Sequence, residues 1–419
     1  MSLIYPFQKW YNTKIMQKKE KRKRRKRYIF GRFARWVLSL IFPKQYRVHY
    51  TYDINIDGVE PPYFMFGNHT SFLDPFLMGI GARHHVNFVA NDEYFRFRSL
   101  SILMRLLGAI PKTKFITDYD TVKLIFKLYD NKDVIGIYPE GGRTWPGLTQ
   151  PLLFSTSKLV KKLNAPVVCA LTKGGSLSFP RWAKKYRKGK IFIHYKLVLT
   201  PEQIEKMTAQ EIHEVLTKEL AHDEIAWNKA AKIAFKGKKL AERLELFIYS
   251  CPKCNGFETM TSKDNEYTCR ECGYKVKYNP YGLFERENDA PIYDNVTDWN
   301  IAQYKLMKEK LSRLNEGETL LQQDAVKLFN GKRKERVLGI LLQGALSLNN
   351  EGFVIKSDNE TRTYHYDKIS GLTVNHSNIL DFYYDGEKLR FEFKNKQICG
   401  YIWEDAIKAL KEINAPAAE

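Results

Sequence analysis

Four cysteines constrain the fold of one segment of this sequence more tightly than any other feature does. They form two Cys-x-x-Cys pairs, Cys251 with Cys254 and Cys269 with Cys272, with fourteen residues between the pairs. This spacing is typical of a four-thiolate zinc site. Because a segment of about forty residues cannot bury enough apolar surface to fold alone, we expect structural zinc in a small ribbon over residues 251–290.

The other cysteines and the charge of the ribbon narrow its function. Cys169 and Cys399 stand alone, so the six cysteines indicate metal binding in a reducing compartment and not a disulfide framework. We interpret these two as small core residues. Residues 251–290 hold six basic and seven acidic residues. A near-neutral ribbon argues against nucleic-acid binding, so no nucleic-acid partner is expected.

The net charge of +21 is concentrated at the N-terminus. Residues 1–50 contain fifteen Lys or Arg and one acid, a difference of +14, whereas residues 321–419 contain fourteen of each sign. The block at residues 18–27 has nine basic residues out of ten. Such a patch indicates a polyanionic partner: a membrane surface, a nucleic acid or an acidic protein.

An amphipathic helix is predicted directly after this basic block, over residues 29–42. Arg32 and Arg35 interrupt its apolar residues, and the segment is shorter than the roughly 20 residues that a spanning helix needs. We predict that residues 1–45 bind the cytoplasmic face of a membrane, as a peripheral or monotopic segment. A core helix after a solvated charge run, or a nucleic-acid tail, is the alternative. The apolar residues recur at spacings of mostly three and four: Ile29, Phe30, Phe33, Trp36, Val37, Leu40 and Ile41.

Residues 46–230 alternate between strand-like and helix-like patterns. Residues 63–66 and 134–138 are short buried-strand runs, and residues 121–129 and 156–163 have helical patterns. This alternation predicts an α/β domain with a partly parallel sheet. Polar motifs follow both strands, at the position where such sheets usually bind ligands.

The rest of the chain predicts smaller units. We expect a linker helix over residues 231–250, the ribbon over 251–290 and a helical linker over 291–328. Residues 329–419 contain short strands separated by turns, such as Asn349–Gly352, and then a helix over 404–413. This pattern predicts a small β-barrel capped by a helix. Its topology resembles the pleckstrin-homology/GRAM-like barrel, a resemblance that assigns no ligand.

A histidine and an aspartate, His69 and Asp74, follow the predicted strand at residues 63–66. Histidine is the usual base for activating a hydroxyl, and a carboxylate can hold its second ring nitrogen. On a continuous helix the two would lie about 140° apart, so we expect a loop at residues 69–71 and a helix from about 72, with Ser71 as N-cap. The alternative is a plain capping box in which Ser71 and Asp74 only begin a helix.

A second motif follows the other strand, at residues 138–144. Gly141 and Gly142 allow backbone amides to approach an anion. Arg143 can bind phosphate oxygens with its planar guanidinium. Glu140 can orient Arg143 or form a hydrogen bond with a hydroxyl of the substrate. The alternative is a surface turn, for which this composition is also suited. Lys114 is a second candidate phosphate contact.

The order of these motifs resembles the four blocks of the glycerolipid acyltransferases, whose type enzyme is 1-acylglycerol-3-phosphate acyltransferase. The resemblance covers roughly residues 46–220. It rests on Asn68-His69 with Asp74, on Gly108–Lys114, on Tyr138–Thr144 and on Ala165–Val168.

The resemblance implies a reaction and a set of site residues. His69 would be the general base and Asp74 its partner. The base would activate the free hydroxyl of 1-acylglycerol 3-phosphate or a related lysophospholipid, which attacks a fatty acyl thioester on coenzyme A or acyl carrier protein. The acceptor would be bound by Lys114, Glu140, Gly141, Gly142, Arg143 and Thr144. Membrane lipids, the lysophospholipid acceptor and acyl carrier protein are therefore the expected partners, in phospholipid synthesis.

The sequence departs from the family pattern near the second motif. Lys114 stands where arginine is common, Gly142 where threonine is common, and Trp145-Pro146-Gly147 and Leu152–Phe154 replace a more basic run. These changes leave the catalytic pair intact and the identity of the acceptor open. Two other functions are retained as alternatives: a catalytically silent lipid-binding adaptor, and a zinc-containing nucleic-acid-binding protein.

Overall fold

The structure is a computed structural model that describes residues 28–113, 118–330, 339–375, 377–396 and 398–415. The chain divides into two compact units, and each is described by itself. The first runs to Gly142 and includes Pro151–Thr172 and Ile191–Ala221. The second contains Arg143–Gln150, Lys173–Lys190 and the chain from His222 onward.

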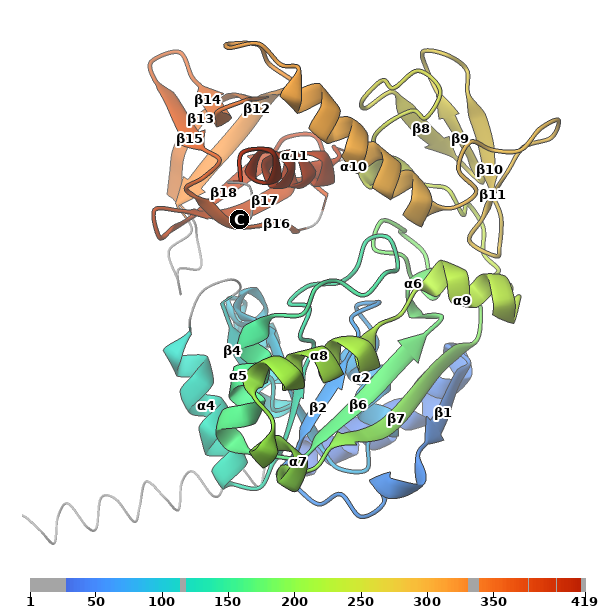
Figure 1. The fold of residues 1–419 in the computed structure, drawn as a ribbon, viewed down its shortest axis with the longest axis vertical. Helices are drawn as coiled ribbons and strands as arrows, with labels where there is room; N and C mark the ends of the chain where they lie inside the picture. The colour runs from blue at the N-terminus through green and yellow to red at the C-terminus, as the bar shows by residue number, and fades with distance from the viewer. Residues whose placement is uncertain (1–27, 114–117, 331–338, 376, 397, 416–419) are drawn as a thin grey trace, which may run out of the picture. The chain divides into compact units, whose positions relative to one another are not determined.

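A seven-stranded sheet is the centre of the first unit (Figure 1). The strands lie in the order β1-β7-β6-β2-β5-β3-β4. The pairs β1–β7, β6–β2, β2–β5, β5–β3 and β3–β4 are parallel, in agreement with the predicted α/β domain. The strands are β1 (Val48–Tyr52), β2 (Phe64–Gly67), β3 (Val86–Asn91), β4 (Ile110–Lys112), β5 (Val134–Ile137), β6 (Val167–Lys173) and β7 (Ile191–Leu199).

Helices cover both faces of this sheet because its central strand is apolar on both sides. Phe64 and Phe66 of β2 pack on one side with side chains of α4, α5, α7 and α8. Tyr63 and Met65 pack on the other side with α2 and with Phe42. The helices are α2 (Asp74–Gly81), α3 (Arg98–Leu106), α4 (Tyr119–Asp130), α5 (Phe154–Leu163), α7 (Pro201–Lys206) and α8 (Ala209–Leu220).

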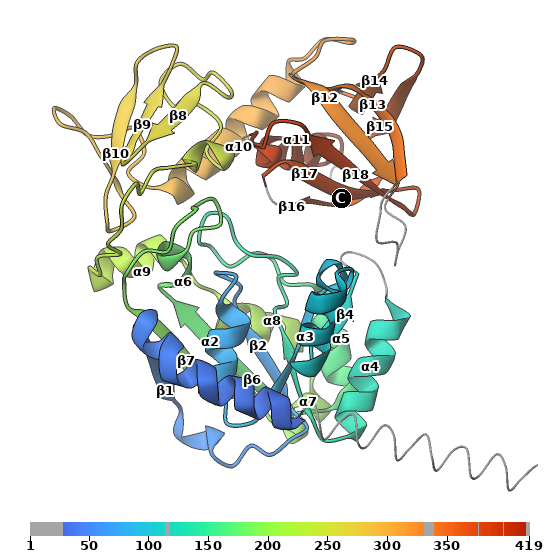
Figure 2. The same ribbon diagram turned by 180° about the vertical axis from the view of Figure 1, so that it is seen from behind.

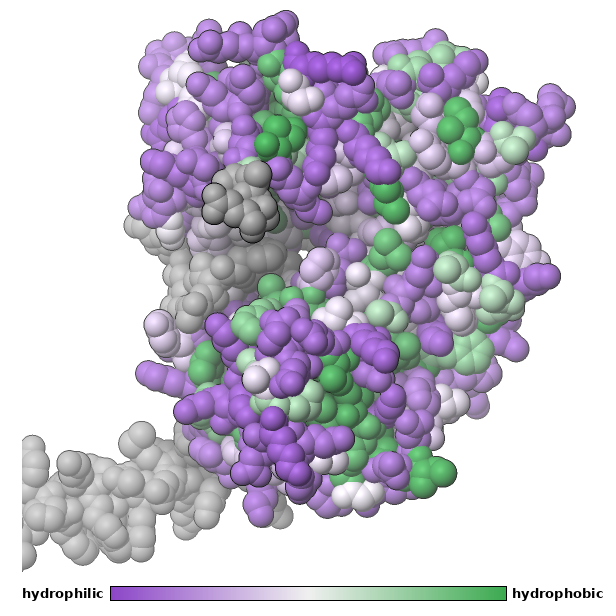
Figure 3. All heavy atoms as spheres, viewed as in Figure 1, coloured by the Kyte–Doolittle hydropathy of each residue, from purple (hydrophilic) through white to green (hydrophobic). Residues whose placement is uncertain are grey.

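A helix over residues 28–45 lies across the second of these faces (Figure 2). Phe42 packs on the core of the sheet, and Arg35 Nη1 donates to the Arg83 carbonyl at 3.1 Å. Most of the predicted apolar stripe is exposed, and Phe30 and Val37 are half-buried. The exposed fractions of Ile29, Phe33, Trp36, Leu40 and Ile41 are 51–58%. The face drawn in Figure 3 shows a different hydrophobic group, over β6 and β7. Among the described residues, no helix is long and apolar enough to cross a membrane.

Two antiparallel sheets belong to the second unit. The four-stranded sheet has the order β11-β10-β9-β8 and carries Cys269 at the end of β9. Its strands are β8 (Met260–Lys263), β9 (Glu266–Cys269), β10 (Lys275–Tyr278) and β11 (Phe284–Glu285). In the sequence, α6 (Gly175–Ser178) and α9 (Glu224–Ala231) precede the four-stranded sheet, and α10 (Val296–Ser312) follows it.

The linker helix predicted for residues 231–250 is wrong. The segment contains one short 3-10 turn, Leu244–Leu246, and Arg243 has a left-handed φ of +74°. Leu240, Ala241, Leu244 and the residues 246–248 are all buried in the core of the cysteine-bearing sheet. Packing of these residues in the core of that sheet overrides the local pattern that predicted a helix.

The second antiparallel sheet has seven strands in the order β15-β14-β13-β12-β18-β17-β16. It begins at Leu321, earlier than the predicted boundary at 329, and α11 (Gly400–Ile413) follows it. Phe353, Phe391 and Trp403 pack together between sheet and helix. Closure into a barrel of the pleckstrin-homology/GRAM type remains a prediction. The strands are β12 (Leu321–Asn330), β13 (Gly339–Asn349), β14 (Gly352–Lys356), β15 (Thr361–His365), β16 (Ile369–Asn375), β17 (Ile379–Tyr384) and β18 (Glu387–Phe393).

A buried carboxyl group in α11 predicts a pH-dependent stability. Asp405 accepts a hydrogen bond from the Tyr249 hydroxyl at 2.9 Å, and burial raises its pKa to about 8. The folded state therefore keeps a proton that the unfolded state loses above its ordinary pKa of 3.8. The contribution of protonated Asp405 to the free energy of unfolding is fully present below pH 3.8 and is lost as the pH rises to about 8. The free energy of unfolding falls by at most about 1.4 kcal/mol per pH unit over this range.

Asp405→Asn is expected to reduce this pH dependence, because an amide does not ionise. Urea unfolding from pH 5 to pH 8 measures it: the free energy of unfolding should fall less steeply in the variant than in the wild type. Asp385→Asn, at an exposed turn before β18, is the matched control and should keep the wild-type slope. Equal slopes for wild type and Asp405→Asn would contradict the prediction.

Candidate active site

His69 and Asp74 form a hydrogen-bonded pair after the central strand of the first unit. The chain leaves β2 at Gly67 and begins α2 at Asp74, and His69 Nδ1 lies 2.9 Å from Asp74 Oδ2. A carboxylate only accepts hydrogen bonds, so Nδ1 carries the proton and Nε2 is the basic nitrogen of the neutral ring. The predicted loop at 69–71 is confirmed. The helix begins two residues later than predicted, with Leu73 and not Ser71 as N-cap residue.

The Asp74 carboxylate also binds the loop that carries His69. Its Oδ2 accepts from the backbone N–H groups of Thr70 at 2.6 Å and Ser71 at 2.8 Å. Its Oδ1 accepts from the hydroxyls of Ser71 at 2.8 Å and Thr70 at 3.0 Å. Asp74 thus makes the capping-type contact with Ser71 and orients His69 at the same time. The two readings of the sequence do not exclude each other.

Asn68 attaches the same loop to the neighbouring strand β6. Its side-chain Nδ2 donates to the Thr172 carbonyl at 2.9 Å, and its Oδ1 accepts from the Thr172 N–H at 2.8 Å. The amide therefore continues the strand pairing beyond the end of β2. The sequence assigned no role to Asn68, although a buried amide with both a donor and an acceptor is the side chain that can do this.

Glu140 holds the backbone of His69. Glu140 follows β5, the other neighbour of β2, and its Oε1 accepts from the His69 N–H at 2.6 Å. Its side chain is buried. The sequence predicted that Glu140 would orient Arg143 or bind the acceptor, and it did not predict this contact. The two motifs meet because β2 and β5 are parallel neighbours whose carboxyl ends share one edge of the sheet.

Tyr138 packs against the imidazole ring. The ring centroids of Tyr138 and His69 are 4.3 Å apart at 18°, and 20% of the His69 side chain remains exposed. Burial, followed by the charge of Asp74, raises the pKa of Tyr138 well above its usual value, so Tyr138 is a neutral phenol. The stack restricts the rotation of His69 and leaves part of its side chain accessible. The sequence analysis included Tyr138 in the second motif but predicted no contact of its ring with His69.

Five further residues are predicted to contact the acceptor. Gly141 has a φ of +71°, a conformation that favours glycine, and its N–H donates to the Tyr138 carbonyl at 3.1 Å. A Cβ at Gly142 would meet no atom within 4 Å, so crowding does not require glycine there. Arg143 and Thr144 open a segment that belongs to the second unit. Lys114 lies outside the described residues.

Thr144 uses its hydroxyl inside its own loop. Its Oγ1 accepts from the Gly147 N–H at 3.1 Å, and the residue is buried. This contact closes a turn over residues 144–147. A role of Thr144 in binding the acceptor stays a prediction.

The four cysteines of the second unit converge on one point. All their Sγ atoms lie within 4.8 Å of one another. The Sγ atoms of Cys251 and Cys272 are 3.5 Å apart, and those of Cys254 and Cys269 are 3.7 Å apart. Tetrahedral zinc with Zn–S bonds of about 2.3 Å requires separations of about 3.8 Å, whereas a disulfide requires about 2.05 Å. The four thiols therefore fit a zinc ion.

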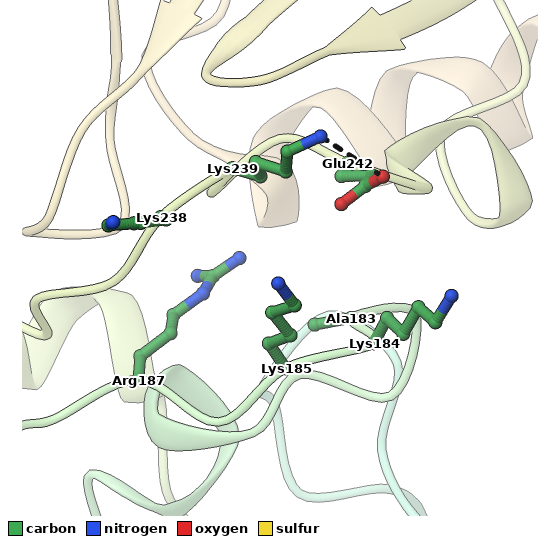
Figure 4. A pocket seen from close by; sticks show the side chains of 7 residues that line it. All are labelled: Ala183, Lys184, Lys185, Arg187, Lys238, Lys239 and Glu242. Atoms are coloured by element: carbon green, nitrogen blue, oxygen red, sulfur yellow. Dashed lines mark ion pairs between the residues drawn. The ribbon is translucent and has the colours of Figure 1, made fainter.

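A basic hollow in the second unit is too small for an organic ligand. Its volume is about 10 Å³, roughly the space of one water molecule. An ion pair of 3.9 Å joins Lys239 Nζ to Glu242 Oε1 across one side (Figure 4). We assign no ligand to it. The charged side chains around it are Lys184, Lys185, Arg187, Lys238, Lys239 and Glu242.

Comparison with known proteins agrees with the geometry of the first unit. Residues 47–172 match the family model described as Acyltransferase. A curated 1-acyl-sn-glycerol-3-phosphate acyltransferase of Bacillus subtilis (strain 168) is 23% identical over 124 residues. That match covers 29% of this chain and 59% of the Bacillus protein. An acyltransferase domain is therefore supported for the segment that contains His69, Asp74 and Glu140.

Two solved structures show weaker likenesses. The 1-acyl-sn-glycerophosphate acyltransferase PlsC from Thermotoga maritima is 17% identical, with 52% of this chain and 87% of that chain covered and a TM-score of 0.37. A chain of the 8S snRNP assembly intermediate is 13% identical, with 25% and 91% covered and a TM-score of 0.19. At these TM-scores neither likeness supports an argument.

Proposed function

We propose that the protein is an O-acyltransferase that moves a fatty acyl group from a thioester to the free hydroxyl of 1-acylglycerol 3-phosphate or a related lysophospholipid. The observation that carries the proposal is the 2.9 Å contact of His69 Nδ1 with the buried Asp74 carboxylate. It provides a neutral imidazole with Nε2 as the base. The acyltransferase match over residues 47–172 supports the reaction class.

In the proposed reaction the proton and the acyl group move in opposite directions. His69 Nε2 takes the proton of the acceptor hydroxyl while the hydroxyl oxygen attacks the thioester carbonyl. The carbon–sulfur bond then breaks, and the thiolate of coenzyme A or acyl carrier protein leaves with the proton from His69. Asp74 stabilises the transient imidazolium without taking its proton. The products are the ester and the free thiol.

The acceptor phosphate is assigned to the second motif. The N–H groups beside Gly141 and Gly142 and the guanidinium of Arg143 have the chemistry that a phosphate needs. Glu140 serves this site indirectly, because its carboxylate already accepts the His69 N–H. Lys114 and Thr144 complete the proposed set.

We infer that the protein works at the cytoplasmic face of a membrane, as a peripheral or monotopic enzyme. The exposed side chains of Phe33 and Trp36 support this, since amphipathic helices insert such residues at the lipid boundary. The basic block at residues 18–27 lies outside the described residues. Acceptor and product are both amphiphiles, so a membrane location brings the enzyme to its substrate.

The double substitution Phe33→Glu with Trp36→Glu is expected to weaken membrane binding at least about tenfold, because two exposed aromatic residues are replaced by anions. Sedimentation with phosphatidylglycerol–phosphatidylcholine vesicles measures the bound fraction. Ile301→Glu, at a residue of α10 with 45% of its surface exposed, is the control and should bind as the wild type does. Unchanged vesicle binding of the double variant would rule out this helix as the contact.

Product analysis tests the acyl-transfer proposal. The purified full chain is offered 1-acylglycerol 3-phosphate, other lysophospholipids and glycerol 3-phosphate, with acyl-CoA or acyl carrier protein thioesters, and the lipids are identified by mass spectrometry. We expect phosphatidic acid or a closely related diacyl product. Vesicle binding without any acylated product would instead favour the silent lipid-binding adaptor.

A further inference from the structure

The segment Arg143–Thr149, which begins with the last two residues of the second motif, is bound along its length by other parts of the second unit. The Pro146 carbonyl accepts from Thr297 Oγ1 of α10 at 3.0 Å. The Gly147 carbonyl accepts from the Glu224 N–H of α9 at 3.1 Å. Thr149 exchanges two 3.0 Å hydrogen bonds with the backbone of His222. Its backbone conformation is therefore set by contacts far away in the sequence.

Arg181 binds the backbone of Arg143, one of the predicted phosphate-binding residues. Its Nη1 donates to the Arg143 carbonyl at 2.8 Å, and its Nη2 donates to the Val374 carbonyl of β16 at 2.7 Å. Its guanidinium carbon lies 4.2 Å from the ring centroid of Trp145. Burial lowers the pKa of Arg181 to about 10, so the group remains a cation at neutral pH.

Trp145 connects the segment to the apolar parts of the second unit. Its ring stacks on Phe247 at 5.7 Å and 12° and lies 5.2 Å from the Tyr401 ring of α11. Phe247 is buried in the same apolar cluster as Cys251 and Cys269. Trp145 is one of the residues at which this sequence departs from the acyltransferase pattern, and these contacts give the departure a structural reason.

We propose that Arg181 is a positioning residue for the acceptor. It holds the backbone of Arg143, so contacts within the second unit fix the backbone at the end of the phosphate-binding motif. The proposal rests on the acyl-transfer function proposed above. Arg143 is joined directly to Gly142, and a fixed backbone reduces the entropy that its planar guanidinium loses when it binds phosphate at two points. Arg181 does not touch the reacting atoms in this proposal, and its effect passes through Arg143.

The contact requires arginine and not only a positive charge. Two carbonyls, those of Arg143 and Val374, are bound by two different nitrogens of one planar group that also lies over an indole ring. A lysine ammonium is a single point donor on a flexible chain and cannot reproduce this fork. Arg181→Lys should therefore keep the charge and release one of the two carbonyls.

Steady-state kinetics of Arg181→Lys test the proposal. We expect the KM for 1-acylglycerol 3-phosphate to rise about tenfold, with the kcat and the KM for the acyl thioester changed less than about twofold, because only acceptor binding is disturbed. Arg187→Lys is the matched control. Arg187 (Figure 4) is a buried arginine of the second unit that donates to the Leu240 carbonyl and lies over Trp182 and Tyr278. It should leave the acceptor KM unchanged.

Hydrogen exchange of the peptide over residues 143–150 provides a readout without turnover. Its amides should exchange faster in Arg181→Lys than in the wild type or in Arg187→Lys, and Trp145→Phe should have a smaller effect in the same direction. Unchanged exchange in Arg181→Lys, or equal acceptor KM shifts in both arginine variants, would overturn the proposal. If the wild type forms no product, the acyl-transfer proposal fails, and exchange still decides whether Arg181 holds the segment.

Discussion

Replacing His69 with alanine is expected to lower the kcat of acyl transfer by about 10² to 10⁴, the range that a general base usually contributes. The imidazole is the basic group held by Asp74, and two side chains beside it have other roles. Tyr138 is a neutral phenol because burial raises its pKa. Glu140 already accepts the His69 N–H. Turnover is measured as phosphatidic acid formed per enzyme with saturating acceptor and acyl thioester.

The control for this variant is a second His–Asp pair of the first unit. His194 Nε2 lies 3.1 Å from Asp53 Oδ1, and both side chains are 42% exposed. His194→Ala removes the same chemical group and should keep kcat within about twofold of the wild-type value. Vesicle binding should be unchanged in His69→Ala. Turnover near the wild-type level in His69→Ala, or an equal loss in His194→Ala, would refute the proposed mechanism.

Local spacing explains why the catalytic pair could be predicted from the sequence. His69 and Asp74 are five residues apart, so one loop decides whether they meet. The Glu140 contact depends on β2 and β5 being parallel neighbours, which is not apparent for two residues separated by 71 positions in the sequence. The stack of Tyr138 on His69 has the same origin. Pairs that are close in the sequence are visible in its pattern, and contacts across strands are not.

The same distinction holds for the fold. The four cysteines could be grouped from spacing alone because a metal site needs fixed ligand geometry. The linker helix was predicted wrongly because the residues 246–248 pack in the core of the cysteine-bearing sheet, and tertiary packing overrides local propensity. Trp145 read as a departure from the family pattern, and its partners Phe247 and Tyr401 lie more than 100 residues away. The contacts of Trp145 with Phe247 and Tyr401 explain why tryptophan stands at this position, and the motif alone does not.

Loss of the metal is expected to have the largest effect on stability. We propose that zinc is bound in about a one-to-one ratio to the chain, and zinc sites of this type contribute on the order of 10 kcal/mol to folding. Cys251 and Cys269 are buried in a cluster with Trp299, Tyr267 and Phe247. Without the metal, that cluster loses the link between its two cysteine pairs. Cys254→Ser should therefore bind little zinc, measured by mass spectrometry of the metal, and should show a strongly lowered Tm.

Loss of the metal should also impair acyl transfer. Phe247 of the same cluster stacks on Trp145, which lies in the segment that Arg181 holds. A chelator should thus raise the acceptor KM together with the hydrogen exchange of residues 143–150, and added zinc should reverse both. Cys169→Ser is the matched control: Cys169 is a buried thiol of β6 outside the metal site, and its variant should keep the zinc. If Cys254→Ser retains zinc and the wild-type Tm, the four thiols are not a structural zinc site, and the link from the ribbon to the acceptor is lost with it.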